Sequence, residues 1–164
     1  TKNTRLLAGG WLGAKDKPFF EEQIERIRQA GQMEGFEYRD CPTHADKERI
    51  LSEMDVFTLP TDYHEPKGLS VLEAWATGVP TVLPNHGSFP ELLEQALLHS
   101  AEPGMRYPPG DQEFLVELLS NLLLNPEEAA FLGQQGRQAV ERWFNAQRMA
   151  DETARWYHSL PAPN

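Results

Sequence analysis

Residues 55–84 read DVFTLPTDYHEPKGLSVLEAWATGVPTVLP, in which two short strand patterns flank a helical one. The first, DVFTLP, is rich in β-forming residues and closed by Pro60, so we expect a buried strand. The last, TVLP, is a second short apolar strand. The helical pattern between them stops at Gly78 and Pro80. Its apolar spacing fits either of two stripes: Leu69, Leu72 and Trp75, or Val71, Ala74 and Trp75.

The same alternation of strands and helices extends to both sides of this stretch. Before it, LLAGG and FEYRD are strand candidates, and PFFEEQIERIRQAG is a helix that begins near Pro18 and ends near Gly31. Thr43 and Asp46 form a capping-box-like pair before another short helix. After it come a short helix in NHGSFPELLEQ, a weak strand in MRYPPG, three helical segments and a frayed end in PAPN.

Short buried strands that alternate with helices are typical of an α/β fold, in which helices cover both faces of a parallel sheet. Such sheets bind ligands at the carboxyl ends of their strands, which points to the loops after LLA, FEYR, VFTL and TVL. The 164 residues fit a single domain, residues 1–164, with extra helices toward the carboxyl end. Because the chain enters its first strand almost at once, we expect a piece of a longer protein.

Composition argues against several classes of function. The formal net charge of −10 is unsuited to a broad nucleic-acid or anionic-membrane surface. No apolar run approaches the ~20 residues that span a bilayer, so we expect no transmembrane segment. The single cysteine, Cys41, excludes an internal disulfide and a cysteine-rich zinc site, and the histidines show no paired ligand spacing. This cysteine usage suggests a reducing compartment, and we expect a cytoplasmic protein.

The loop after VFTLP carries the chemistry. Gly68 allows close backbone approach, and the helix that begins there directs unpaired amides and a positive dipole end toward an anion such as a diphosphate. Glu65 can accept hydrogen bonds from neutral hydroxyls, whereas Glu73, about one turn inside the helix, can take two hydroxyls of a ribose. The loop therefore suits a nucleotide sugar. The same spacing also fits a solvated loop charge and a surface helix residue.

The longer pattern D-V-F-T-L-P-x4-E-P-K-G-L-S-V-L-E-A-W-A-T-G-V-P-T-V-L-P resembles the donor-site signature of the GT-B glycosyltransferases of group 1, the retaining family with an E-x7-E motif. The similarity extends from about Leu6 to Glu91 and is most specific across residues 55–84. It implies the Rossmann-like carboxyl-terminal half of a GT-B fold, preceded by an amino-terminal acceptor domain that this chain lacks. It also implies a nucleotide diphosphate sugar as donor substrate, with no other cofactor and no metal.

The resemblance implies a role for each residue of the motif. Glu65 would be the catalytic carboxylate beside the transferred sugar, and Glu73 would bind the ribose. The donor's sugar and phosphates would contact the segment between them: Pro66, Lys67, Gly68, Leu69 and Ser70. In a looser inference, the nucleobase would lie at the end of an earlier strand, at Asp40, Cys41 and Pro42.

The sequence also departs from the family pattern. The usual Gly-Phe-Gly after the first glutamate is replaced by Pro66, Lys67 and Gly68. Pro66 removes an amide donor, while Lys67 either adds charge near a phosphate or faces solvent. The family's Arg and Lys, which neutralise the leaving diphosphate, have no counterpart here, because Lys15 and Lys17 follow the wrong strand. We therefore expect the isolated chain to have little or no transferase activity.

Other interpretations stay open at this point. A related GT-B epimerase or phosphorylase would share the same pattern, and so would a non-catalytic nucleotide-binding domain. A-G-G-W-L-G lacks a complete G-x-G-x-x-G, and no G-x-S-x-G elbow suggests hydrolysis. His64 is interpreted as a loop neighbour of Glu65, and His86 and Gly87, at another strand end, as residues that could line the cleft.

Overall fold

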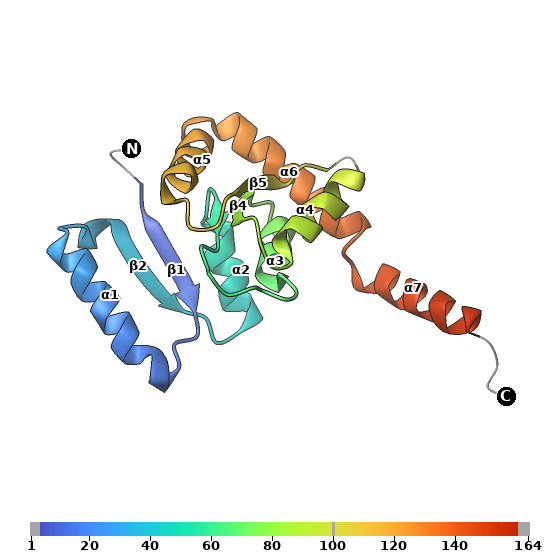
Figure 1. Ribbon diagram of the computed structural model, residues 1–164, viewed down its shortest axis with the longest axis horizontal. Helices are drawn as coiled ribbons and strands as arrows, with labels where there is room; N and C mark the ends of the chain where they lie inside the picture. Colours follow the sequence, from blue (N-terminus) through green and yellow to red (C-terminus); the bar gives the residue numbers. More distant parts are fainter. Residues whose placement is uncertain (1–3, 100, 161–164) are drawn as a thin grey trace. The chain divides into compact units, whose positions relative to one another are not determined.

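The computed structural model describes residues 4–99 and 101–160, so the frayed end expected in PAPN lies outside the described residues. The chain forms two compact units, Thr1–Met54 and Asp55–Asn164 (Figure 1). Both contain parallel strands flanked by helices, which confirms the predicted α/β fold. Within the described residues, none of the helices has the length and apolar character needed to cross a bilayer.

The Thr1–Met54 unit has a two-stranded parallel sheet. Strand β1 (Leu6–Gly10) pairs in register with β2 (Phe36–Asp40). A 3-10 turn (Ala14–Asp16), helix α1 (Lys17–Gln29) and a second 3-10 turn (Met33–Gly35) connect the two strands. Helix α2 (His44–Ser52) follows β2. Both strands and both α-helices lie where the sequence predicted them, whereas the two 3-10 turns were not predicted.

Helices α1 and α2 cover opposite faces of this small sheet. Phe20 of α1 packs its ring 4.8 Å from that of Tyr38. Gly9 pairs with Arg39, the strand residue after Tyr38. A Cβ on Gly9 would lie 3.1 Å from the side chain of Ile50 on α2. Successive strand residues point to opposite faces, so the two helices sandwich the strands. Thr43 caps α2 and exchanges hydrogen bonds with Asp46, which confirms the predicted capping box.

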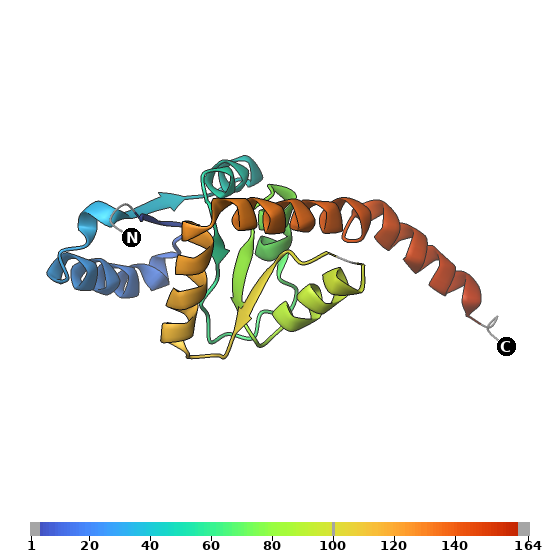
Figure 2. The same ribbon diagram turned by 90° about the horizontal axis from the view of Figure 1, so that it is seen from above.

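The Asp55–Asn164 unit has a three-stranded parallel sheet in the order β3-β4-β5. Its strands are Phe57–Thr58, Thr81–Pro84 and Gly104–Tyr107. Its helices are α3 (Leu69–Ala76), α4 (Phe89–Leu98), α5 (Gln112–Leu124), α6 (Pro126–Arg142) and α7 (Ala146–Ser159), which can be followed in Figure 2. The central strand β4 is buried throughout. Strand β3 is shorter than the predicted DVFTLP, because only Phe57 and Thr58 pair with β4.

Two apolar clusters pack on the two faces of β4. Leu83 belongs to a cluster with Val71, Trp75 and Phe89, which lie on α3 and α4. Its neighbour Val82 faces a second cluster built largely from α5 and α6: Tyr107, Leu122, Ala129 and Leu132. The face that α3 buries is therefore the stripe of Val71, Ala74 and Trp75, while Leu69 is 59% exposed.

Helix α6 packs against α3 through glycines. A Cβ on Gly133 would lie 2.0 Å from the carbonyl oxygen of Gly78, and one on Gly136 would lie 2.9 Å from the indole of Trp75. Both distances are shorter than any real carbon contact, so only glycine permits this approach. This contact with α6 fixes the carboxyl end of α3. The position of its amino end depends on the loop that follows β3.

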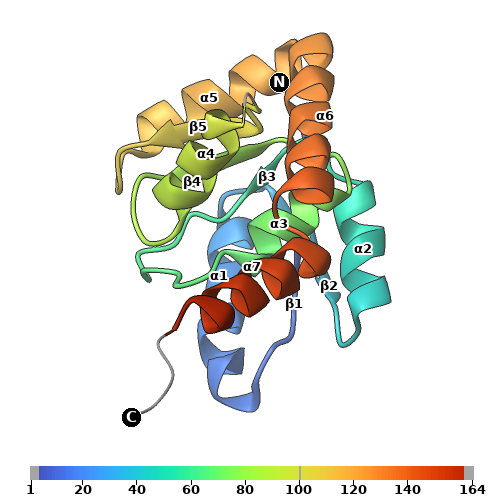
Figure 3. The same cartoon turned by 90° about the vertical axis from the view of Figure 1, so that its right-hand side faces the viewer.

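The chain changes direction between α6 and α7 (Figure 3). At this corner the ring of Trp143 stacks on His99 with 3.5 Å between ring centroids, and the guanidinium of Arg148 lies 4.6 Å from the Trp143 ring. These contacts hold the beginning of α7, none of whose described residues is buried.

Candidate functional site

The loop between β3 and α3 ends in a residue that must be glycine. Gly68 caps α3 with φ of +65°, a left-handed conformation that side-chain-bearing residues rarely adopt. A Cβ there would lie 2.5 Å from Leu92 Cδ1 and 3.1 Å from Ser88 Oγ. Both conformation and space thus explain the glycine, and α4 fixes where α3 begins.

The carboxylate of Glu65 is held by its own loop. Its Oε1 accepts hydrogen bonds from the backbone amides of Lys67 and Gly68, both at 3.1 Å. Pro66 lies between Glu65 and these two donors. Its lack of an amide hydrogen removes none of the hydrogen bonds of this arrangement. Within the described residues Oε2 forms no hydrogen bond, so the anchored carboxylate has an oxygen left for a ligand.

The first turn of α3 offers further donors. The amides of Val71 and Leu72 donate to the Gly68 carbonyl, at 3.0 and 3.2 Å. Those of Leu69 and Ser70 have no acceptor within the described residues, as expected for the first positions of a helix. The resemblance implied anion binding by the amides of Gly68 and Leu69, but the Gly68 amide already donates to Glu65. The amides that remain for an anion are those of Leu69 and Ser70.

Glu73 lies on α3 three residues after Ser70 and four after Leu69. Residues at these spacings share one face of a helix, and side chains tilt toward its amino end. The half-buried Glu73 side chain is therefore on the face that adjoins the open amides. The roles predicted for Glu65–Ser70 and Glu73 stay predictions, but the fold brings these residues to one end of one helix.

The loop that follows β4 contacts the loop between β3 and α3 that carries Glu65. His86 Nε2 lies 2.7 Å from the Thr61 carbonyl oxygen, and the His86 ring stacks on His64 at 4.8 Å. Ser88 donates its amide hydrogen to the Glu65 carbonyl at 2.8 Å. The sequence identified His86 only as a residue that could line the cleft, because a strand end reveals nothing about what its loop contacts. The available signal was a histidine followed by glycine, two residues after the end of a buried strand.

The residues predicted to hold a nucleobase lie in the other unit. Asp40 ends β2, and the buried Cys41 donates its amide to the Gly10 carbonyl at 3.2 Å. The Cys41 thiol contacts the carbonyl oxygen of Arg39 at 3.4 Å, and Pro42 is exposed. Cys41 therefore has a structural role at the strand end, and the nucleobase assignment remains a prediction.

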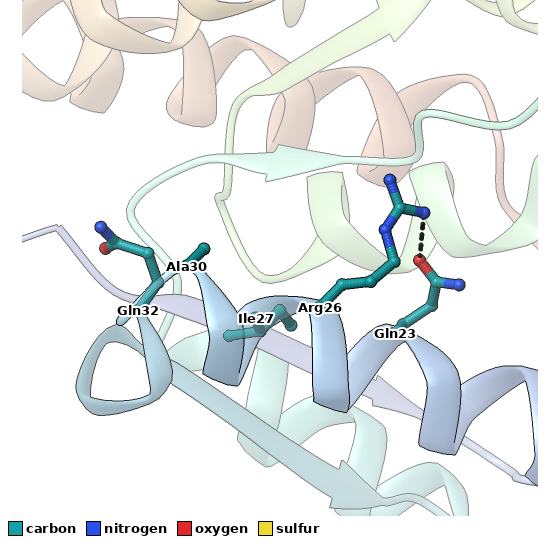
Figure 4. Close-up of a pocket in the computed structure, with 5 residues that line it drawn as sticks. All are labelled: Gln23, Arg26, Ile27, Ala30 and Gln32. Carbon is teal, nitrogen blue, oxygen red and sulfur yellow. Dashed lines mark hydrogen bonds between the residues drawn. The ribbon is translucent and has the colours of Figure 1, made fainter.

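A shallow hollow of about 390 Å³ lies on α1 and the turn after it (Figure 4). It is lined by Gln23, Arg26, Ile27, Ala30 and Gln32. The Arg26 guanidinium is held by the Gln23 side chain at 3.1 Å. None of the predicted site residues lines this hollow. Within the described residues, no group of three or more His, Cys, Asp or Glu side chains is arranged to hold a metal ion.

Comparison with curated proteins finds a synthase and a transferase among the relatives of this chain. The chain is 30% identical over 162 residues to alpha-maltose-1-phosphate synthase of Mycolicibacterium smegmatis, covering 92% of this chain and 40% of that protein. It is 33% identical over 89 residues to the sulfoquinovosyl transferase of Arabidopsis thaliana, covering 54% of this chain and 17% of the relative. The chain thus spans less than half the length of either relative.

Solved structures share the fold. A sucrose-phosphate synthase from Thermosynechococcus elongatus superposes with a TM-score of 0.79 at 23% identity, over 94% of this chain and 38% of that one. Anabaena HepE in complex with UDP and glucose gives 0.81 at 18% identity, over 95% and 41%. The family model described as glycosyl transferases group 1 matches residues 2–139. The chain therefore belongs to the group 1 glycosyl transferases, as the resemblance of its donor-site pattern implied.

Proposed function

We propose that this chain is the donor-binding domain of a glycosyltransferase, which binds a nucleotide diphosphate sugar between the Glu65 loop and the first turn of α3. One observation carries the proposal: Glu65 is anchored through Oε1 to the Lys67 and Gly68 amides, and the next two amides along the chain, those of Leu69 and Ser70, have no acceptor among the described residues. An acceptor for hydroxyls and donors for an anion therefore adjoin each other, as a sugar linked to a phosphate requires.

In the proposed complex each group has one task. The amides of Leu69 and Ser70 and the positive end of α3 bind the diphosphate. Glu65 Oε2 accepts from hydroxyls of the donor sugar, and Glu73 accepts from the ribose. Lys67 is exposed and adds a positive charge at the loop. Asp40, Cys41 and Pro42 are kept as proposed nucleobase contacts, and no metal is part of the proposal.

Transfer breaks the bond between the sugar's anomeric carbon and the phosphate oxygen, and the electron pair leaves with the nucleoside diphosphate. The acceptor's hydroxyl oxygen forms the new bond to the same carbon, and its proton passes to the phosphate oxygen that leaves. The anomeric carbon becomes oxocarbenium-like as the diphosphate departs, so charge stabilisation at the phosphates is where the amides act. We propose retention of configuration, with the acceptor bound by a further domain of a longer cytoplasmic enzyme.

Calorimetric titration with UDP and with UDP-glucose tests the donor site; the uridine compounds are chosen because HepE, a protein of the same fold, was solved with UDP. We expect both to bind, and Glu73→Ala to weaken both by about 10- to 100-fold, since a hydrogen-bonded carboxylate contributes about 1.5–3 kcal/mol. Glu128→Ala, an exposed glutamate on α6, is the matched control. Binding of neither ligand, or equal binding by the Glu73→Ala variant, would overturn the proposal.

The chain on its own should bind the donor without transferring its sugar efficiently, because the proposed acceptor contacts lie outside it. A transfer assay with UDP-glucose and oligosaccharide acceptors measures this directly. Turnover comparable to that of a complete transferase would contradict the assignment of this chain to the donor side alone.

A further inference from the structure

We propose that His86 is a positioning residue for Glu65. It follows strand β4, which lies beside β3, and it holds the loop at residues 61–65 so that the Glu65 carboxylate meets the donor sugar in one orientation. This inference rests on the proposed donor-binding function. It concerns a residue outside the Glu65–Glu73 motif, contributed by the loop after β4.

The hydrogen bond of His86 fixes its tautomer. Nε2 lies 2.7 Å from the Thr61 carbonyl oxygen, and because a carbonyl can only accept, Nε2 carries the hydrogen. Nδ1 is buried and has no partner within the described residues. Nε2 therefore holds the beginning of the Glu65 loop through its hydrogen bond. Nδ1 forms no hydrogen bond within the described residues, so a substitution of His86 breaks none on that side.

The face of the same ring holds the residue next to Glu65. The imidazoles of His64 and His86 stack at 4.8 Å between centroids with 23° between their planes. Phe89 of α4, a member of the buried cluster of that unit, also lies 6.1 Å from the His86 ring. The ring is thus supported by the core and contacts the loop at Thr61 and His64, on either side of a two-residue span.

Gly87 and Ser88, the two residues after His86, contact the backbone of Glu65 itself. Gly87 has φ of +60°, and a Cβ there would lie 2.9 Å from both the amide nitrogen and the carbonyl oxygen of Glu65. Ser88 then donates its amide to that same carbonyl at 2.8 Å. The backbone of Glu65 is consequently fixed on one side by this segment, and its Oε1 on the other by the amides of Lys67 and Gly68.

Three substitutions separate the two contacts of His86. His86→Phe keeps an aromatic ring for the stack and loses the Nε2 donor; because Nδ1 has no partner, it removes no other hydrogen bond. His86→Gln keeps an amide donor at similar reach and loses the ring. His86→Ala loses both. His158→Ala, an exposed histidine on α7, is the control.

Amide hydrogen exchange tests the positioning without any ligand. In His86→Ala we expect the Lys67 and Gly68 amides to exchange about 10-fold faster or more, with an unchanged rate at Val82 in the buried strand β4, because the opening is local rather than global. His86→Phe and His86→Gln should lie between His86→Ala and the wild type. Unchanged exchange at Gly68 in His86→Ala would overturn the inference, and so would an equal acceleration at Val82, which indicates general destabilisation.

Ligand affinities then test whether His86 acts through Glu65. We expect His86→Ala to weaken UDP-glucose binding by roughly 3- to 10-fold and to leave UDP binding unchanged, since only the sugar contacts Glu65. Glu65→Ala should do the same, and the double variant should lose little beyond the larger single effect, because residues that act as one unit are not additive. Additive losses, or equal losses for UDP and UDP-glucose, would overturn the positioning role.

The two proposals fail in different ways. If the wild type binds neither UDP nor UDP-glucose, the donor-site proposal fails, while exchange at Gly68 still decides whether His86 positions the loop. If the wild type binds both and Glu65→Ala selectively weakens UDP-glucose but His86→Ala does not, the donor site stands and the role of His86 is refuted.

Discussion

Trp75 and Thr81 are joined by a hydrogen bond inside the protein. The indole Nε1 donates to Thr81 Oγ1 at 3.1 Å, and both residues are 0% exposed. This bond links α3 to the beginning of β4, across the turn at Gly78 that reverses the chain. It therefore sets the distance between the helix that carries Glu73 and the strand that leads to His86.

Thr81→Val should destabilise the protein by about 1–3 kcal/mol, because it leaves the buried indole N–H without an acceptor while nearly preserving volume. Chemical denaturation monitored by tryptophan fluorescence or circular dichroism measures this change. Thr153→Val on the exposed α7 is the control and should be close to neutral. A Thr81→Val variant as stable as the wild type would show that the indole finds another partner.

Gly133→Ala should destabilise the protein by about 2 kcal/mol or more, since its Cβ would overlap the Gly78 carbonyl oxygen and α6 would have to move. The sign is diagnostic, because Gly→Ala in an exposed helix normally stabilises by about 0.5–1 kcal/mol. Gln134→Ala, at the next and exposed position of the same turn, controls for helix propensity. A stabilising Gly133→Ala would refute the close approach of α6 to α3.

Gly68→Ala should cost more than Gly110→Ala, although both residues have positive φ, +65° and +80°. Each pays the conformational penalty of roughly 1 kcal/mol, but only Gly68 would also drive a Cβ against Leu92 and Ser88. Thermal unfolding of the two variants gives the comparison. We further expect only Gly68→Ala to weaken UDP-glucose binding, and equal behaviour of the pair would contradict the packing at Gly68.

Hydrogen bonds from Arg39 lower the pKa of Glu37 and of Glu53 below the ordinary 4.5, and reach their carboxylates at 2.7 Å. Arg39→Gln should raise both pKa values toward 4.5, as measured by carboxyl NMR titration. Arg137→Gln, which removes the partner of Glu141 in the other unit, should leave both unchanged.

The sign of the linked stability follows from these lowered pKa values. Each carboxylate contributes stability that is fully present above pH 4.5 and is lost as the pH falls through its lowered folded-state pKa. Arg39→Gln should therefore lose less stability on acidification below pH 4.5 than the wild type does. Since both carboxylates are exposed, we expect a small difference. A steeper acid dependence in Arg39→Gln would contradict this sign.

Much of the fold follows from local pattern. Strands LLAGG, FEYRD and TVLP were predictable because each is a short apolar or alternating run bounded by turn residues, and the α2 cap because Thr43 and Asp46 carry its mechanism within four residues. The buried stripe of α3 was not, since Leu69 and Val71 both have helical spacing. Packing against Leu83 of β4 and Phe89 of α4, later in the chain, decides between them, because it buries Val71 and leaves Leu69 exposed.

The candidate site divides in the same way. Glu65, Gly68 and Glu73 could be identified because their chemistry is expressed within one loop and one helix. Two features could not be identified. The use of the Lys67 and Gly68 amides by Glu65 depends on the path of the loop, and the contact of His86 with the Thr61 carbonyl depends on which strand lies beside β3. Both are properties of the tertiary arrangement, which no short motif records.

The anchored carboxylate of Glu65 also gives the proposed site a polarity. Its negative charge lies at the approach to a helix whose amino end is positive, so anionic and neutral ligand groups are sorted along a single turn of chain. For a donor bound as proposed, reversing the molecule would bring a diphosphate against Glu65 and leave sugar hydroxyls at the positive end. One side chain would then select which way round the donor enters.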